Sequence, residues 1–160
     1  MAYHDDLLAQ AVKLVHEDAV SPRQASLRRA GSAAYYSVFH MLIAESTSNW
    51  NRANLQAALS RAFDHNLMKT ASQGIANSNT FPFAGENPAA VTALRFVGLT
   101  FTQLQEQRHF ADYNLTRDLA YTDALAQAQS AQKVFTIWQS VQNEQIAQAY
   151  LVSLVVKHRS

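Results

Sequence analysis

The chain has 160 residues, of which 48% are hydrophobic, and its formal net charge at pH 7 is only +1. This length and composition suit a single domain over residues 1–160 with its own hydrophobic core. The weak net charge excludes non-specific attraction of nucleic acid by the molecule as a whole, and the lack of cysteine excludes disulfides and thiolate chemistry.

Local sequence predicts helices throughout the chain. No segment alternates apolar and polar residues for long enough to predict a strand, and glycine (4) and proline (3) are scarce, which is typical of an all-α protein. The predicted helices, in chain order, have approximate bounds Tyr3–Asp18, Pro22–Glu45, Ala53–Ala71, Pro88–Phe110 and Thr122 to nearly the C-terminus. Ser21 caps the second helix and Pro22 opens it. Gln73–Asn87, rich in small polar residues, is predicted to be a long loop.

The last predicted helix contains neither proline nor glycine, so it either continues unbroken or breaks near Gln142 and Asn143. Its final part, residues 143–160, is more apolar than an exposed helix should be. We expect this part either to pack back on the body of the protein or to pair with another chain. The second outcome is favoured here and predicts a homodimer or a larger assembly.

The N-terminal sequence MAYHDDLLAQ is acidic and lacks the basic and apolar regions of a signal peptide. The longest apolar runs are shorter than the roughly 20 residues that span a bilayer. We therefore expect no membrane segment and a cytoplasmic location.

The helix predicted over residues 22–45 carries a line of polar side chains on a largely apolar surface. Steps of four residues from Arg28 lead to Ser32, Tyr36 and His40. Such a helix belongs inside a bundle, where the polar line needs partners or a cleft. Arg28 and the neighbouring Arg29 are candidates for a basic patch, and Tyr36 and His40 are candidates for ligand contact. The alternative is that the tyrosine and the histidine are core residues and that the arginines are solvated.

A second group of polar residues lies in the stretch LQEQRHFADYN, residues 104–114. Arg108 and Asp112 are four residues apart and are expected to pair along the helix. His109 points about 100° away from Arg108 around the helix axis. An arginine can stabilise a phosphate and a histidine can act as general acid or base, so we take Arg108 and His109 as candidate catalytic residues. Asp112 and Tyr113 are candidates for ligand contact, with a purely structural role as the alternative.

Two stretches of the sequence resemble the HEPN domain family. SAAYYSVFHMLIAES is similar to the family's second-helix signature, and LQEQRHFADYN followed by TRDLAYTDALAQAQSAQKVF is similar to its later segment. SRAFDHNLMK, between them, resembles the family's middle helix. The resemblance covers residues 21–140 and implies an antiparallel bundle of about five helices, a four-helix core with a long C-terminal helix.

HEPN domains commonly form dimers whose clefts bind RNA or nucleotides, and many are metal-independent endoribonucleases. Those enzymes use an arginine, four to six intervening residues and then a histidine. Arg108 and His109 match the arginine and the polar position that follows it. Tyr113, Asn114 and Leu115 stand where the downstream histidine is required, so this chain resembles a branch without the full motif.

The resemblance therefore favours a dimeric module that binds RNA or a nucleotide in a cleft lined by residues 108–113 and the polar side of the second helix. Pairing with a nucleotidyltransferase in a toxin–antitoxin system is implied by the family alone. One alternative is a metal-independent endoribonuclease using Arg108 and His109. The other is a non-catalytic interaction module assembled through the apolar C-terminal helix.

Metal and cofactor sites have no support in the sequence. There are no Glu-x-x-His pairs on two helices, as a di-iron bundle would require. The four glycines are scattered and form no phosphate-binding loop. We expect neither a metal nor a cofactor.

Overall fold

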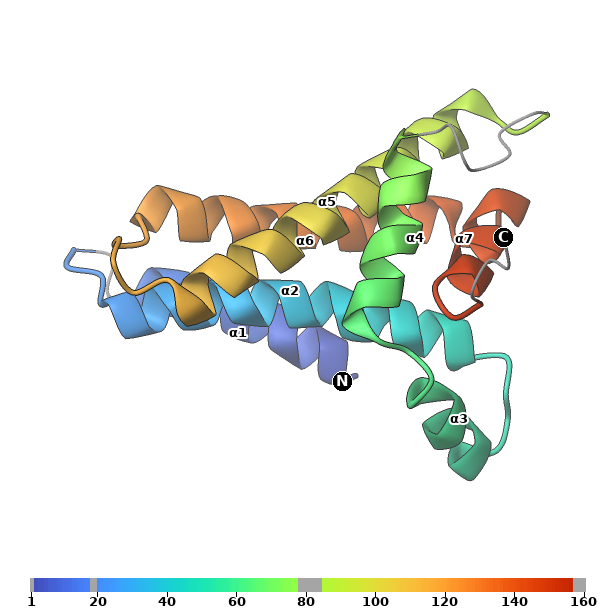
Figure 1. Cartoon of the computed structure of the whole chain (residues 1–160), viewed down its shortest axis with the longest axis horizontal. Coiled ribbons are helices and arrows are strands. Elements are labelled where there is room, and N and C mark those ends of the chain that lie inside the picture. Colours follow the sequence, from blue (N-terminus) through green and yellow to red (C-terminus); the bar gives the residue numbers. More distant parts are fainter. Residues whose placement is uncertain (1, 18–19, 78–84, 157–160) are drawn as a thin grey trace. The chain divides into compact units, whose positions relative to one another are not determined.

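The computed structural model describes residues 2–17, 20–77 and 85–156, and its elements there are all helices. Their bounds are α1 Tyr3–Glu17, α2 Gln24–Thr47, α3 Ala53–Ser60, α4 His65–Asn77, α5 Pro88–Tyr113, α6 Tyr121–Val141 and α7 Gln145–Ser153 (Figure 1). The all-α prediction is confirmed. The described ranges hold seven helices where about five were expected, because two of the predicted helices are each broken into two.

The chain divides into two compact units. Unit 1 consists of Met1–Met41 and Gln103–Thr136, and unit 2 consists of Leu42–Thr102 and Ile137–Ser160. Helices α2, α5 and α6 each contribute residues to both units.

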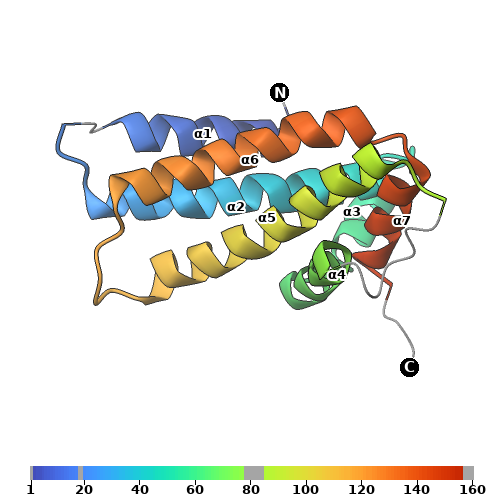
Figure 2. The ribbon, with the colours of Figure 1, turned by 90° about the horizontal axis from the view of Figure 1, so that it is seen from above.

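In unit 1, α2 lies at the centre and contacts three other helices (Figure 2). The His40 ring of α2 packs edge-on against Tyr3 of α1, with 4.9 Å between ring centroids. On another side, Arg108 of α5 approaches Tyr36. The start of α1 thus meets a late part of α2, so the two helices run antiparallel. Gly31 has no side chain at the point where Gln127 of α6 lies against α2, which leaves room for that amide.

In unit 2, α4 packs against α5 and α7. Gly98 of α5 lies so close to α4 that a Cβ atom there would come within 2.7 Å of the Ser72 carbonyl oxygen. The Ser72 and Tyr150 hydroxyls, both fully buried, form a 2.7 Å hydrogen bond between α4 and α7. The Tyr150 ring also contacts Trp138 at the end of α6. These contacts place α7 in the core of unit 2.

The prediction of a single helix over Ala53–Ala71 is wrong, because the structure has two helices there, α3 and α4. They are separated by residues 61–64, where Phe63 is buried and the Asp64 carboxylate accepts a 2.8 Å hydrogen bond from the backbone N–H of Leu67. Asp64 therefore caps the start of α4. An aspartate directly before a helical apolar pattern is a known start signal, so the sequence did carry the information.

The last predicted helix breaks at residues 142–144, the second of the two expected outcomes. Glu144 has extended backbone angles, with φ −70° and ψ 144°, and α7 begins directly after it. The buried residues of α7 are Ile146, Ala147, Tyr150 and Leu151. The apolar C-terminal segment thus packs against the rest of the chain as far as the end of α7 at Ser153. Most apolar side chains of this segment are therefore buried within the chain instead of forming the face on which the expected homodimer was based, while Val152 and Val156 stay 58% and 54% exposed.

The loop predicted over Gln73–Asn87 is wrong in its first part, because residues 73–77 form the last turn of α4. Residues 78–84 lie outside the described part of the chain. None of the helices within the described ranges has the length and apolar character needed to cross a membrane.

Replacing Tyr150 with phenylalanine is expected to lower the free energy of unfolding by about 1 kcal/mol at neutral pH, because the buried Ser72 hydroxyl loses its partner. Burial raises the pKa of the Tyr150 hydroxyl well above its usual range, and the Ser72 hydrogen bond offsets only part of this rise. The folded protein therefore favours the neutral phenol. The stability that this provides is complete below about pH 10 and is lost as pH rises from there towards the folded-state pKa.

Urea unfolding of both proteins from neutral to alkaline pH measures this effect. The stability difference between wild type and Tyr150→Phe should shrink above about pH 10, where only the wild type can ionise a phenol at this position. A difference that stays constant with pH would contradict a buried neutral hydroxyl at position 150.

Candidate functional site

The candidate site is a groove between α1 and α2 in unit 1, with a volume of about 410 Å³. Its lining residues are Tyr3, Leu7, Gln10 and Leu14 from α1 and Arg29, Ser32, Ala33, Tyr36 and His40 from α2. The α1 residues recur at steps of three or four, and so do the α2 residues apart from the adjacent pair Ser32 and Ala33, so each set lies on one side of its helix. We call this feature the α1–α2 groove.

The charge of the α1–α2 groove comes from one arginine. Arg29 is the one lining residue with a permanent charge, and no lining residue is a carboxylate. Ser32 and Gln10 add neutral hydrogen-bonding groups. The groove is therefore suited to a ligand with limited negative charge, such as a single phosphate group, rather than to a polyphosphate.

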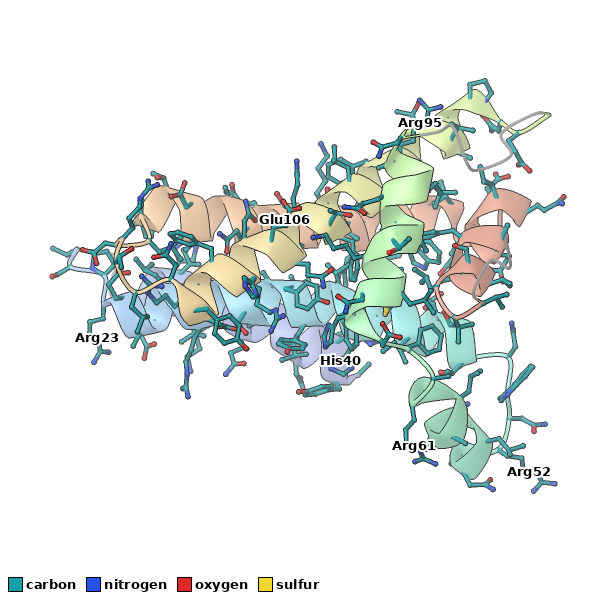
Figure 3. All side chains as sticks on the ribbon, viewed as in Figure 1. Arg23, His40, Arg52, Arg61, Arg95 and Glu106 are labelled. Atoms are coloured by element: carbon teal, nitrogen blue, oxygen red, sulfur yellow. The ribbon has the colours of Figure 1, made fainter. Side chains whose placement is uncertain are left out.

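Aromatic rings form a connected series along the α1–α2 groove. The ring of His40 lies between Tyr3, at 4.9 Å with the rings at 65°, and Tyr36, at 6.1 Å with the rings at 29°. Tyr3 is 62% exposed, so its ring is available to a ligand. Figure 3 shows His40 on α2, on the side of that helix where α1 begins. Flat aromatic surfaces of this kind can stack on a nucleobase.

Arg108 supports Tyr36 from the α5 side. One terminal nitrogen of Arg108 lies 3.3 Å from the Tyr36 hydroxyl and 3.4 Å from an Asp112 carboxylate oxygen. The guanidinium carbon lies 5.2 Å and 5.5 Å from the ring centroids of Tyr35 and Tyr36, within cation–π range. The expected pairing of Arg108 with Asp112 is confirmed. The buried Nε atom of Arg108 has no hydrogen-bond partner among the described residues.

The same arginine affects the titration of Tyr35. Burial raises the pKa of the Tyr35 hydroxyl well above its usual range, and the positive charge of Arg108 offsets only part of this rise. Tyr35 is therefore a neutral phenol at physiological pH. Its role here is to pack beneath Arg108 rather than to exchange a proton.

Arg28 has a structural role instead of a place in the groove. Its guanidinium donates hydrogen bonds to the carbonyl oxygens of Ala111 and Asn114, both at 2.8 Å, and of Arg117. These carbonyls lie at the end of α5 and directly after it, where a helix leaves its last carbonyls unpaired. Arg28 therefore caps α5.

His109 and Tyr113 lie in a different hollow from the α1–α2 groove. Their rings are 4.8 Å apart, and both line a depression of about 540 Å³ at the end of α5, together with Glu106, Phe110 and residues 114–116. Arg108 faces α2 and is largely buried, whereas His109 is exposed. The structure thus places these neighbouring residues in different surroundings.

The predicted site residues fall into four groups. Arg29, Tyr36 and His40 line the α1–α2 groove, and Arg108 with Asp112 supports Tyr36 from behind. His109 and Tyr113 line the second hollow, and Arg28 caps α5. Sequence reasoning missed Tyr3 and Gln10, which belong to the groove. Their helical spacing with Leu7 and Leu14 was the available signal, since it places all four on one face of α1.

Metal-binding geometry is not found in the part of the chain that the structure describes, because no three histidine or acidic side chains gather there.

Comparisons with family models, with curated proteins and with solved structures found no match. The resemblance to HEPN domains therefore depends on the sequence stretches quoted above.

Proposed function

We propose that this chain is a HEPN-like helical module that binds RNA or a nucleotide in the α1–α2 groove. One observation carries the proposal: Arg29, Tyr36 and His40, all singled out by the sequence, line one groove together with the exposed ring of Tyr3. The arginine supplies a phosphate contact, and the rings supply stacking surfaces for a base.

The proposed binding site differs from the cleft that the sequence suggested. That cleft combined the polar side of the second helix with residues 108–113. In the structure Arg108 reaches the groove only through Tyr36, and His109 lines a separate hollow. We therefore assign ligand contact to the α1 and α2 residues and treat Arg108 as the residue that positions the Tyr36 ring.

A ribonuclease using Arg108 and His109 has less geometric support. Cleavage by a ribose 2′-OH needs a cation and a general base that act on the same phosphate. Arg108 is held by Tyr36 and Asp112, whereas His109 packs against Tyr113. The homodimer and the nucleotidyltransferase partner remain predictions of the family resemblance.

Replacing Arg29 with alanine is expected to weaken the binding of a labelled mixed-sequence RNA by about tenfold and to reduce its salt dependence by about one phosphate contact. The reason is that Arg29 supplies the permanent positive charge of the groove. Fluorescence polarisation in EDTA at several salt concentrations measures both effects. Lys13→Ala is a matched control, since it removes one positive charge from an exposed α1 position outside the groove.

Equal losses in Arg29→Ala and Lys13→Ala would show that the groove is not the binding site. Gel analysis of the same samples reports cleavage. Cleavage in EDTA that disappears in a folded His109→Ala protein would replace the binding proposal with the ribonuclease alternative. Absence of both binding and cleavage would leave an interaction module.

A further inference from the structure

Helix α3, Ala53–Ser60, differs from the other helices of unit 2 because none of its residues is buried. Leu55 on α3 is 50% exposed, and Trp50, just before the helix, is 48% exposed. These two large apolar side chains are exposed five positions apart in the sequence, and exposed apolar side chains can form part of an interaction surface. We call Trp50, Arg52, Leu55 and Arg61 the α3 surface.

Local contacts hold α3 in its helical form. The backbone N–H groups of Leu55 and Gln56 donate to the Arg52 carbonyl at 3.1 Å and 3.0 Å, and the Gln56 side-chain amide donates to the Trp50 carbonyl. Phe63, just beyond the helix, is buried. A helix of eight residues is marginally stable without tertiary packing. The chain therefore presents a formed short helix whose apolar side chains lie outside its own core.

The charge of this region has one sign. Between residues 48 and 63 the charged side chains are Arg52 and Arg61, and no carboxylate occurs. Both arginines are exposed, and Figure 3 shows them pointing outward from opposite ends of α3. Asp64 follows directly, but its carboxylate caps α4. Leu55 thus lies between the two arginines in the sequence and Trp50 lies just before the first of them, and this segment contains no acidic residue.

We propose that the α3 surface binds an acidic, amphipathic segment of a partner protein. Tryptophan and arginine are the residues most enriched where binding energy is concentrated in protein interfaces. Arg52 and Arg61 are nine positions apart, which corresponds to roughly 13 Å along the helix axis. The partner would place apolar side chains on Trp50 and Leu55 and carboxylates at a similar separation.

Two other classes of partner fit the α3 surface less well. Single-stranded RNA is bound by stacking successive bases on several aromatic rings, whereas this surface offers a single tryptophan ring beside one leucine and two arginines. A lipid surface needs a helix with a broad apolar face and many basic residues. The combination of aliphatic area and few charges favours a protein segment, and this inference does not depend on the proposed groove function.

The test is a selection of random displayed peptides on the immobilised full-length protein, followed by affinity measurements with selected peptides. Peptides rich in aspartate or glutamate together with apolar residues are expected. The double variant Arg52→Glu/Arg61→Glu should bind them at least about tenfold more weakly, because attraction becomes repulsion. Thermal unfolding should be little changed, since none of these side chains is buried.

Lys13→Glu/Arg117→Glu is the matched control, because it makes the same change of net charge at two exposed positions of unit 1. Loss of peptide binding in the α3 variant but not in this control supports the proposal. The proposal is overturned by selected peptides without acidic enrichment, by no selection above the bare support, or by equal losses in both variants. Oligouridine binding or binding to phosphatidylglycerol vesicles that depends on Arg52 and Arg61, without peptide binding, would also overturn it.

Discussion

Replacing Gly98 with alanine is expected to lower the free energy of unfolding by about 2 kcal/mol. Alanine would favour helix α5 by about 1 kcal/mol over glycine if there were room for its side chain. At this position, however, the new Cβ would lie 2.7 Å from the Ser72 carbonyl oxygen and would overlap the Ile75 side chain. Because one of the obstacles is the backbone of α4, α4 and α5 must move apart, and overpacking of this kind outweighs the gain in helix propensity.

Gly31→Ala is a matched control for this prediction, because it makes the same substitution in another long helix. Its Cβ would meet only the amide end of the Gln127 side chain, which can rotate away. The free energy of unfolding should therefore change by less than about 1 kcal/mol. Urea unfolding followed by circular dichroism compares the two variants. Equal effects at the two glycines would contradict close packing of α4 on α5.

Replacing Arg28 with alanine is expected to lower the free energy of unfolding by about 3 kcal/mol, the largest effect predicted here. The guanidinium donates to the carbonyls of Ala111, Asn114 and Arg117, and its positive charge lies at the negative end of the α5 dipole. Hydrogen bonds from a charged donor contribute more than neutral ones, and the Ala111 and Asn114 carbonyls, whose hydrogen bonds are partly buried, would lose this partner. The same unfolding measurement tests this prediction.

Two further variants separate the cap from charge alone. Arg28→Lys keeps the positive charge but cannot reach three carbonyls with one ammonium group, so it should recover only part of the lost stability. Arg29→Ala removes a neighbouring charge from an exposed position and should change stability by no more than about 0.5 kcal/mol. If Arg28→Ala and Arg29→Ala lower the free energy of unfolding by the same small amount, the cap makes no significant contribution to stability.

The different roles of Arg28 and Arg29 show where sequence reasoning reaches its limit. Both residues belong to one helix, and both were candidates for the same basic patch. Arg28 does not contribute to that patch, because α5 ends beside it. Its guanidinium instead donates to the Ala111 carbonyl, 83 residues away in the sequence. Arg29, one position further round the helix, faces α1 and lines the groove. Nothing in the local pattern distinguishes these two outcomes.

The sequence by itself determined the features that depend on neighbours within one or two helical turns. These features are the all-α class, the alignment of Tyr36 and His40 on one face of α2, and the Arg108–Asp112 pair. The Asp64 cap of α4 is also local, because the Asp64 carboxylate accepts from Leu67, three residues further along, but it was not predicted. Helical periodicity is a local property, so spacing in the sequence is enough to reveal it.

Tertiary structure alone decided which face of each helix meets which neighbour. It packed α7 on α4 within unit 2, it separated His109 from Arg108, and it formed the groove from faces of α1 and α2. These outcomes depend on contacts between residues far apart in the chain. A helix with several apolar faces can bury any of them equally well, so its own pattern does not specify its partner.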